Sequence, residues 1–396
     1  MDFEQVTQKD KPMFTKRSVS FLLVCVFVLT ACTGQPTVTP TTPTTQPTSL
    51  TDAILTATAA AFIPGPTGTA APSIPAPTVT AVPSATIAPI SPGLPDISSL
   101  IYLDDRSTPA ALMLSYFNAI NKRSYLQAYS YYTHYAALGT LDEFSNGYSE
   151  TQSVSVVFGN ISSEGAAGSI YYTVPMVLNA TTTANIQQKF AACYVLRLPQ
   201  PGNYGAPPIT PLHIERGTAQ SIPLTTQDAA ALSFACPSPD FPTGPNASPA
   251  AVETLTDLSP ANYIDNRSDA VALMSSYLNS INRQEYVRAF SYWQTPVSTY
   301  DAFATGYATT ASITAQFGTV TPDAGAGQVY YSLPVALKST MTDGSLKTYV
   351  GCFVMHLAQP GFQGTVPFQP LGITNATINL VDNSADLISL LTTACQ

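Results

Sequence analysis

Charged side chains are scarce in this sequence of 396 residues, because Asp, Glu, Lys and Arg together make up only 10% of it. A typical soluble domain carries about 25%. The 15 basic residues are outnumbered by 24 acidic ones, which gives a net charge of −9. This balance argues against nucleic acid as a partner, because phosphate binding depends on clustered Lys and Arg. It also argues against a coiled coil, whose seam is flanked by charged residues.

The N-terminal segment has the features of an export signal. Basic residues precede an apolar run of about 11 residues at positions 19–29, which is the length of a signal-peptide core and is too short to span a membrane. The run ends in Leu29-Thr30-Ala31-Cys32, which resembles a bacterial lipobox. The resemblance implies that Cys32 is lipidated and that the lipid holds the protein at the bacterial cell membrane or envelope surface. The alternative is an ordinary secretory signal with an incidental cysteine.

The segment that follows the signal is rich in proline and almost uncharged. Residues 33–98 contain 13 prolines, many Thr, Ser and Ala, and only two charges, Asp52 and Asp96. Such a composition buries too little apolar surface to offset the entropy of ordering. We therefore expect a disordered tether that spaces the rest of the chain from the lipid.

Most of the remaining chain is one unit that occurs twice. Residues 102–132 and 263–293 are identical at 16 of 31 positions, at an offset of 161. A repeat of about 135 residues indicates a duplicated domain rather than a solenoid. We divide the chain into a signal peptide (1–31), the lipidated cysteine and tether (32–98), repeat 1 (99–236), a linker with six prolines (237–261) and repeat 2 (262–396).

The remaining cysteines follow the repeat. Cys193 and Cys236 are 43 residues apart, as are Cys352 and Cys395. In an exported protein two repeat-matched pairs predict one disulfide per domain, which joins the end of the repeat to a strand in the middle of its sheet. A metal site is the alternative, but it needs about four ligands, and no His or Cys is available to complete either pair. We predict no metal and no cofactor.

The apolar pattern within each repeat changes from helical to alternating. Ser107 and Ser268 are placed to cap a first helix, and Pro109 suits its first turn. A break at 121–123 precedes a second helix, and a short third helix fits 141–148. Alternating segments then predict strands near 154–156, 170–178, 190–198 and 211–222. The Asp343-Gly344 pair indicates a tight hairpin in repeat 2. The order of elements predicts an α+β class, with two tandem units of helices followed by a curved antiparallel sheet.

The helix–break–helix sequence at 116–125 is similar to the start of nuclear-transport-factor-like cone domains, which include polyketide-cyclase-like and steroid-isomerase-like members. The resemblance covers each repeat. It implies a sheet that wraps around the long helix and leaves a pocket at its wide end. It extends to tandem cone-domain lipoproteins of uncharacterised function.

Enzymes of that superfamily place a His–Asp or Asp–Tyr constellation in the pocket, but the two repeats share no histidine. They do share four acids, which we interpret as helix-capping or ion-pairing residues: Asp104, Asp265, Asp142 and Asp301. If one repeat alone is active, His356 is the best catalytic candidate, although a lone histidine on a strand is more often structural. We predict no catalytic residue.

Most residues that the repeats share are aromatic. The simplest interpretation is that these rings form the core under the sheet. The functional alternative is a ring-lined pocket for a neutral polar ligand such as a sugar, with hydroxyl and amide groups as hydrogen-bonding partners. The candidate pocket residues are Tyr116, Asn118, Tyr125, Phe144, Tyr148, Tyr171, Tyr277, Asn279, Tyr286, Phe303, Tyr307 and Tyr330.

Three functions are consistent with these patterns. The first is a surface-anchored, non-catalytic binding or interaction lipoprotein, with an envelope glycan or protein as its partner. The second is an extracytoplasmic enzyme of isomerase, dehydratase or hydrolase type acting on a small molecule. The third is a purely structural envelope protein. An open cleft lined with rings favours the first, and rings packed into a filled core favour the third.

Overall fold

Both repeats begin with three short helices, as the sequence predicts. The computed structural model describes residues 102–133, 138–237, 258–296 and 298–396; the predicted signal peptide, Cys32 and the tether lie outside the described residues. The helices of repeat 1 are α1 (Pro109–Asn121), α2 (Tyr125–Tyr129) and α3 (Leu141–Gly147). Those of repeat 2 are α5 (Ala270–Asn282), α6 (Tyr286–Ser291) and α7 (Tyr300–Tyr307).

Each set of helices is followed by a five-stranded antiparallel sheet. The strands of repeat 1 are β1 (Thr151–Phe158), β2 (Ser162–Ala166), β3 (Ser169–Thr182), β4 (Gln187–Pro199) and β5 (His213–Ile222). Those of repeat 2 are β6 (Thr310–Phe317), β7 (Thr321–Gly325), β8 (Gln328–Met341), β9 (Leu346–Ala358) and β10 (Gly372–Val381). The orders are β1-β3-β4-β5 and β6-β8-β9-β10, and β2 and β7 pair with β3 and β8. The α+β class and the tandem arrangement are thus confirmed.

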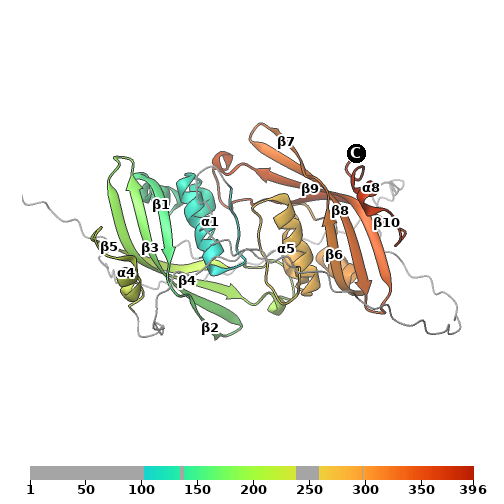
Figure 1. Ribbon diagram of the computed structural model, residues 1–396, viewed down its shortest axis with the longest axis horizontal. Helices are drawn as coiled ribbons and strands as arrows, with labels where there is room; N and C mark the ends of the chain where they lie inside the picture. Colours follow the sequence, from blue (N-terminus) through green and yellow to red (C-terminus); the bar gives the residue numbers. More distant parts are fainter. Residues whose placement is uncertain (1–101, 134–137, 238–257, 297) are drawn as a thin grey trace, which may run out of the picture. The chain divides into compact units, whose positions relative to one another are not determined.

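Strand alternation divides each sheet into two faces. One face of β3 and β4 packs against α1, with Val174, Met176 and Leu196 fully buried between them. The opposite face carries a smaller cluster, in which Val177 and Ala191 contact a terminal helix, α4 (Asp228–Phe234). In Figure 1 α1 and α4 lie on opposite sides of the first sheet. The sheet therefore has a large core on one face and a partial cover on the other.

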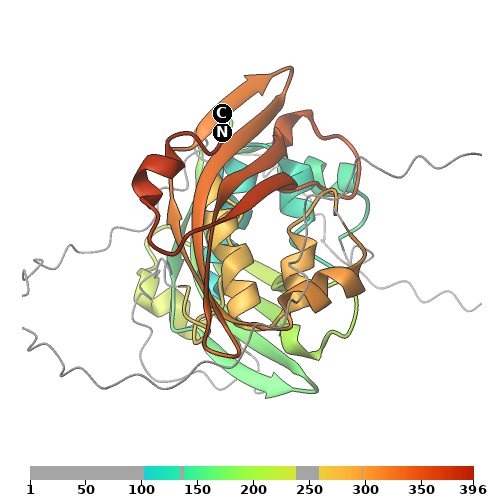
Figure 2. The ribbon, with the colours of Figure 1, turned by 90° about the vertical axis from the view of Figure 1, so that its right-hand side faces the viewer.

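Repeat 2 has the same layers. Leu333 and Phe353 face α5, while Ala336 and Val350 pack under α8 (Leu387–Leu391) on the opposite face. Figure 2 shows α8 beside the strands near the end of the chain. The terminal helices α4 and α8 follow the last strand of each repeat, and their short apolar runs had not been recognised as helices from the sequence.

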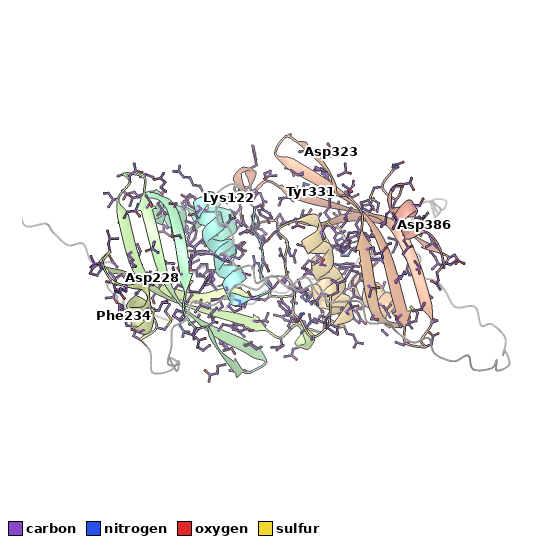
Figure 3. The ribbon with its side chains drawn as sticks, viewed as in Figure 1. Lys122, Asp228, Phe234, Asp323, Tyr331 and Asp386 are labelled. Atoms are coloured by element: carbon purple, nitrogen blue, oxygen red, sulfur yellow. A yellow bond between two sulfur atoms is a disulfide. The ribbon has the colours of Figure 1, made fainter. Side chains whose placement is uncertain are left out.

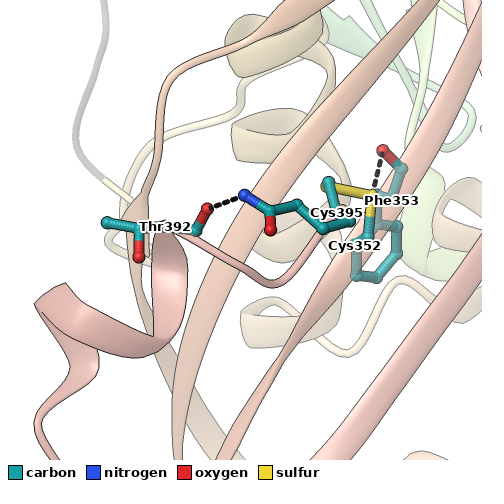
Figure 4. Close-up of a disulfide and its surroundings, with 5 residues drawn as sticks. Cys352, Phe353, Thr392 and Cys395 are labelled. Atoms are coloured by element: carbon teal, nitrogen blue, oxygen red, sulfur yellow. Dashed lines mark hydrogen bonds between the residues drawn. A yellow bond between two sulfur atoms is a disulfide. The ribbon is translucent and has the colours of Figure 1, made fainter.

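Both disulfides are present in the structure. Cys193 of β4 is joined to Cys236, and Cys352 of β9 is joined to Cys395 (Figure 4), with Cα–Cα distances of 5.1 and 4.9 Å. Since β4 and β9 each have a neighbour on both sides, each bond ties the end of its repeat to an inner strand. The disulfides therefore hold the segments after α4 and α8 against the outer faces of the sheets.

The predicted role of Ser107 and Ser268 as helix caps is wrong. The N-cap residues are Thr108 and Asp269, whose side chains accept hydrogen bonds from the amides of Ala111 and Ala272. Ser107 and Ser268 instead accept backbone amides from the other repeat. A serine near a helix start satisfies the local rule for capping, but here its hydroxyl accepts a hydrogen bond from the other repeat.

In the described part of the chain, no helix is both long and apolar enough to cross a membrane.

Candidate functional site

Eight of the twelve candidate pocket residues are rings that pack together in the cores. The hydroxyls of Tyr116 and Tyr148 lie 2.7 Å apart, and those of Tyr277 and Tyr307 are separated by the same distance. Tyr116 and Tyr277 are 0% and 2% exposed. The other four rings pack around these pairs, namely Tyr125, Phe144, Tyr286 and Phe303. This packing favours the structural interpretation for all eight, and burial raises the pKa of Tyr116 and Tyr277, so both phenols are neutral.

The two candidate asparagines hold the chain segments that precede the first helices. Asn118 and Asn279 are fully buried on α1 and α5. Their side-chain oxygens accept the backbone amides of Leu103 and Ile264, each at 3.2 Å. The amide nitrogen of Asn279 donates to two further backbone carbonyls, those of Ser259 and Asn262. These contacts are those of structural residues rather than of ligand-binding groups.

The two remaining candidates, Tyr171 and Tyr330, lie outside the main cores. Tyr171 precedes Tyr172, and Tyr330 precedes Tyr331; adjacent strand residues point to opposite faces. Tyr172 and Tyr331 pack against the cores, so Tyr171 and Tyr330 lie on the outer faces. Tyr330 is 45% exposed. It lies six residues along β8 from Ala336, which packs under α8, and so α8 leaves this part of the outer face open.

A planar polar side chain on the neighbouring strand supports each of these tyrosines. Tyr330 stacks on His356 with 4.6 Å between ring centroids and 30° between planes. At the matching position in repeat 1, the Arg197 guanidinium lies 5.6 Å from the centre of the Tyr171 ring. The strand register pairs Tyr330 with His356 and Tyr171 with Arg197. We call each tyrosine with its supporting side chain a tyrosine platform.

The supports are themselves held by hydrogen bonds. Nδ1 of His356 lies 2.9 Å from Oε1 of Gln294, and Nε2 contacts the side-chain amide of Gln328. The amide nitrogen of Gln294 donates to the carbonyls of His356 and Pro370, which identifies its Oε1 as an acceptor and Nδ1–H of His356 as the donor. In repeat 1, Nε of Arg197 donates to Oγ of Ser169 at 3.1 Å. Both supports are therefore fixed in place beneath their tyrosines.

The environment of His356 does not suit proton transfer. Burial lowers its pKa below the usual value, and Nδ1 and Nε2 both lie against side-chain oxygens of glutamines. A general base needs a free nitrogen within reach of the proton that it removes. His356 therefore acts as a structural support, which is the interpretation that the sequence favours for a lone strand histidine.

The shared acids Asp104 and Asp265 form a buried network. Oδ1 of Asp104 lies 3.4 Å from Nε of Arg106 and accepts from the Tyr131 hydroxyl at 3.1 Å. In repeat 2, the Tyr292 hydroxyl donates to Asp265 at 2.9 Å, and Nε of Arg267 is 3.7 Å away. Each guanidinium also lies over its tyrosine ring, at 4.5 and 4.4 Å. Local ion pairing, as expected, is the role of both acids.

These Asp–Tyr pairs contain the residue types of an acid–base constellation, but a ligand cannot reach them. Asp104 and Asp265 are 1% and 2% exposed, and Tyr131 and Tyr292 are fully buried. Burial and the nearby carboxylates raise the pKa of both tyrosines. The cavity next to Asp265 and Arg267 measures about 80 Å³, well below the roughly 300–1,000 Å³ of ligand pockets. The predicted carboxylates Asp142 and Asp301 lie in the first turns of α3 and α7.

Comparisons of the chain with protein-family models, with curated proteins and with solved structures found no match. Among the residues that the structure describes, no three His, Cys, Asp or Glu side chains are grouped so that they could hold a metal ion.

The sequence signal for the platforms was present in the consecutive tyrosines, because period-two alternation sends only one of each pair into the core. Arg197 was missed because it meets Tyr171 only through strand pairing. Ser169, Gln294 and Gln328 were missed because they hold Arg197 or His356 through tertiary contacts.

Proposed function

We propose that this protein is a non-catalytic binding lipoprotein of the cell envelope that recognises neutral ligands such as glycans through its two tyrosine platforms. The observation that carries the proposal is the exposure of Tyr330, which is 45% accessible while it is held flat against His356. The eight other shared rings pack in the cores. Tyr330 and Tyr171 are therefore the candidates that offer a ring surface to a ligand.

The chemistry of the platform suits a sugar. The apolar face of a pyranose ring stacks on an aromatic face, and its hydroxyls bond to amides and other polar groups at the ring edge. At Tyr330, the amides of Gln294 and Gln328 lie within reach of His356, and the platform carries no formal charge when His356 is neutral. A ring that is already fixed loses little conformational entropy when it binds. The scarcity of charge in both repeats also favours a neutral ligand.

The proposed location rests on the N-terminal sequence and on the disulfides. The lipobox-like segment at 29–32 supports lipidation of Cys32, and residues 33–98 have the composition of a tether. Two disulfides are compatible with an extracytoplasmic location, where the environment is oxidising. We further propose that each repeat is a cone domain related to the nuclear-transport-factor-like superfamily, on the basis of its helix order and of the antiparallel sheet that packs against α1 or α5.

Ligand binding is tested by a screen of neutral oligosaccharides against the full chain. For an oligosaccharide that binds, Tyr330→Ala is expected to weaken the affinity by about tenfold or more, which corresponds to 1.4 kcal/mol. Tyr171→Ala is expected to have a smaller effect, because Tyr171 is less exposed than Tyr330. Phe234→Ala is the matched control, since Phe234, labelled in Figure 3, is an exposed ring (44%) on α4 that belongs to neither platform.

A purely structural role is the second candidate, and the filling of both cores by the shared rings favours it. The same screen separates the two functions. If the folded chain binds no glycan, or if Tyr330→Ala and Phe234→Ala bind with equal affinity, the platform proposal fails and the structural role remains. Anchoring is tested separately, because Cys32→Ser should move the protein from the membrane fraction to the soluble fraction without any effect on binding.

A further inference from the structure

The two repeats meet through the same six-residue motif, at positions 102–107 and 263–268. The described residues of both repeats belong to one compact unit. The Arg106 amide donates to the Asp265 carbonyl at 2.7 Å, and the Arg267 amide donates to the Asp104 carbonyl at 2.6 Å. The Asp104 and Asp265 amides donate to the hydroxyls of Ser268 and Ser107, each at 2.9 Å. We call this set of contacts the junction.

The exchange of contacts across the junction is reciprocal. These four hydrogen bonds form two equivalent pairs that run in opposite directions between the repeats, which is the pattern of an isologous interface. Tyr102 packs against the core of repeat 2, and Tyr263 packs against the core of repeat 1. In such an interface, residues close to the symmetry axis meet their own counterparts. The junction is therefore a surface on which, by geometry alone, a second repeat 1 could also dock.

The centre of the junction differs between the repeats. Asp105 and Asn266 form an antiparallel bridge at equivalent positions, and Nδ2 of Asn266 donates to Oδ2 of Asp105 at 3.1 Å. Each side chain also accepts the amide of the serine two residues later, Ser107 or Ser268, at 2.9 Å. Of the six motif positions, this one alone changes charge between the repeats.

The hydrogen bond between Asp105 and Asn266 forms because the two side chains differ. An ionised carboxylate only accepts hydrogen bonds, whereas an asparagine amide both donates and accepts. Two repeats of the first kind would place two carboxylates face to face, without a donor between them, and close to the buried Asp104 and Asp265. Like charges in a partly buried site repel strongly. Two asparagines, or one asparagine and one aspartate, can form the bond.

We propose that the Asp105–Asn266 pair makes the junction selective, so that repeat 1 accepts a repeat that offers an amide at this position and rejects a second copy of itself. The pairing of repeat 1 with repeat 2 of the same chain is then specified by chemistry as well as by the linker. A single polar contact that sets the partner in an otherwise symmetric interface has the same effect in coiled coils, where a buried asparagine specifies the pairing.

The proposal is tested in the full chain at pH 8 with single and double substitutions of Asp105 and Asn266. Asn266→Asp creates within one molecule the contact that two copies of repeat 1 would make. Hydrogen–deuterium exchange of peptides that cover 102–108 and 263–269 reports the four junction amides. We expect these amides to exchange about tenfold faster or more in Asn266→Asp, and to regain the wild-type rate in the double variant Asp105→Asn with Asn266→Asp. Asp105→Asn alone should remain protected.

Asn379→Asp is the matched control, because it adds the same charge at an exposed position of β10 outside the junction. It should leave the exchange of both peptides unchanged. The proposal is overturned if Asn266→Asp remains as protected as the wild type. It is also overturned if the double variant exchanges as fast as Asn266→Asp alone, since the loss would then come from Asn266 itself and not from the meeting of two carboxylates.

Discussion

The side-chain amide of Asn266 donates a hydrogen bond to the carboxylate of Asp105, 3.1 Å away, and joins the two repeats at the centre of their junction. Burial raises the pKa of Asp105 to about 6, although the hydroxyl and amide of Ser107 act in the opposite direction. The negative charges of Asp265 and Asp104 add to the rise. The stability of the junction should therefore depend on pH in a range where most carboxylates do not titrate.

Asp105 is expected to make the folded protein less stable as the pH rises from 4 to 7. Its folded pKa of about 6 exceeds the usual value of 3.8 for an aspartate, so the folded state holds the proton more tightly than the unfolded state. The stabilisation from protonation is complete below pH 4 and is lost as the pH passes through 6. The loss should be about 2 kcal/mol for this half-buried group. Urea unfolding of the wild type and of Asp105→Asn at several pH values measures it.

The comparison of the two proteins isolates the contribution of Asp105 and of the carboxylates that interact with it, because the titration of the other groups cancels in the difference. Asp105→Asn should gain stability over the wild type as the pH rises from 4 to 7. A difference in unfolding free energy that stays constant over this range would contradict the prediction.

Arg288 is expected to be one of the most costly residues to remove. It is 1% exposed, and it donates to Glu285 at 2.6 Å and to the side-chain oxygen of Asn279 at 2.9 Å. Arg288→Ala would leave buried acceptors without a donor, which should lower the free energy of unfolding by about 3 kcal/mol or more. Chemical denaturation at constant pH gives this value.

Repeat 1 supplies the matched control for Arg288. Its equivalent positions are Gln127 and Ser124, and Gln127 donates to the carbonyl of Leu103 at 2.7 Å. The double variant Arg288→Gln with Glu285→Ser transfers this arrangement to repeat 2. It should cost clearly less than Arg288→Ala, because no buried charge is left unpaired. An equal or larger loss in the double variant would argue that the ion pair itself is required.

The tyrosine pairs in the cores should contribute through their hydroxyls. Tyr116→Phe removes the partner of the Tyr148 hydroxyl at 2.7 Å and is expected to lower the free energy of unfolding by about 1 kcal/mol. Tyr330→Phe is the control, because the ring of Tyr330 is exposed and water can replace its hydroxyl contacts. Thermal unfolding followed by circular dichroism suffices. Equal melting temperatures for the two variants would show that the hydroxyl pair adds no net stability.

The two disulfides should contribute about equally to stability, because each closes a loop of 43 residues. On the chain-entropy model, the removal of either one should cost about 4 kcal/mol. The variants are Cys193→Ser with Cys236→Ser, and Cys352→Ser with Cys395→Ser. Their unfolding midpoints in denaturant are compared with that of the wild type. Full stability of the wild type after complete reduction would contradict the prediction.

The sequence predicted the three helices that open each repeat and the long strands well, because both depend on local patterns, whereas α4 and α8 were missed. The break after α1 was visible at 121–123, and Arg123 has a positive φ of 56° there. The Asp343-Gly344 hairpin joins β8 to β9, with Gly344 at φ 82°. The strands β2 and β7 were missed because they are mostly exposed on both faces, so they lack the alternation by which a strand is recognised.

The candidate residues show the limit of sequence reasoning more clearly. Twelve were proposed from shared identity, and identity does not distinguish a ring in the core from a ring at the surface. Tyr171 and Tyr330 lie on strands β3 and β8 and face away from the cores, whereas the other ten lie on the helices or at their ends and pack inward. Ser107 matched a local rule for helix capping, but the amide that it accepts belongs to Asp265, 158 residues away.

The sequence by itself determined the duplication, the α+β order and the cysteine pairing of this protein, since each can be inferred from the spacing of residues along the chain. Only the tertiary structure decided which tyrosines remain accessible, because exposure depends on what packs against each face of a sheet. It also decided that the Asp104 and Asp265 motifs face each other. Segments so far apart in sequence meet only when both repeats are folded, and no local pattern records that contact.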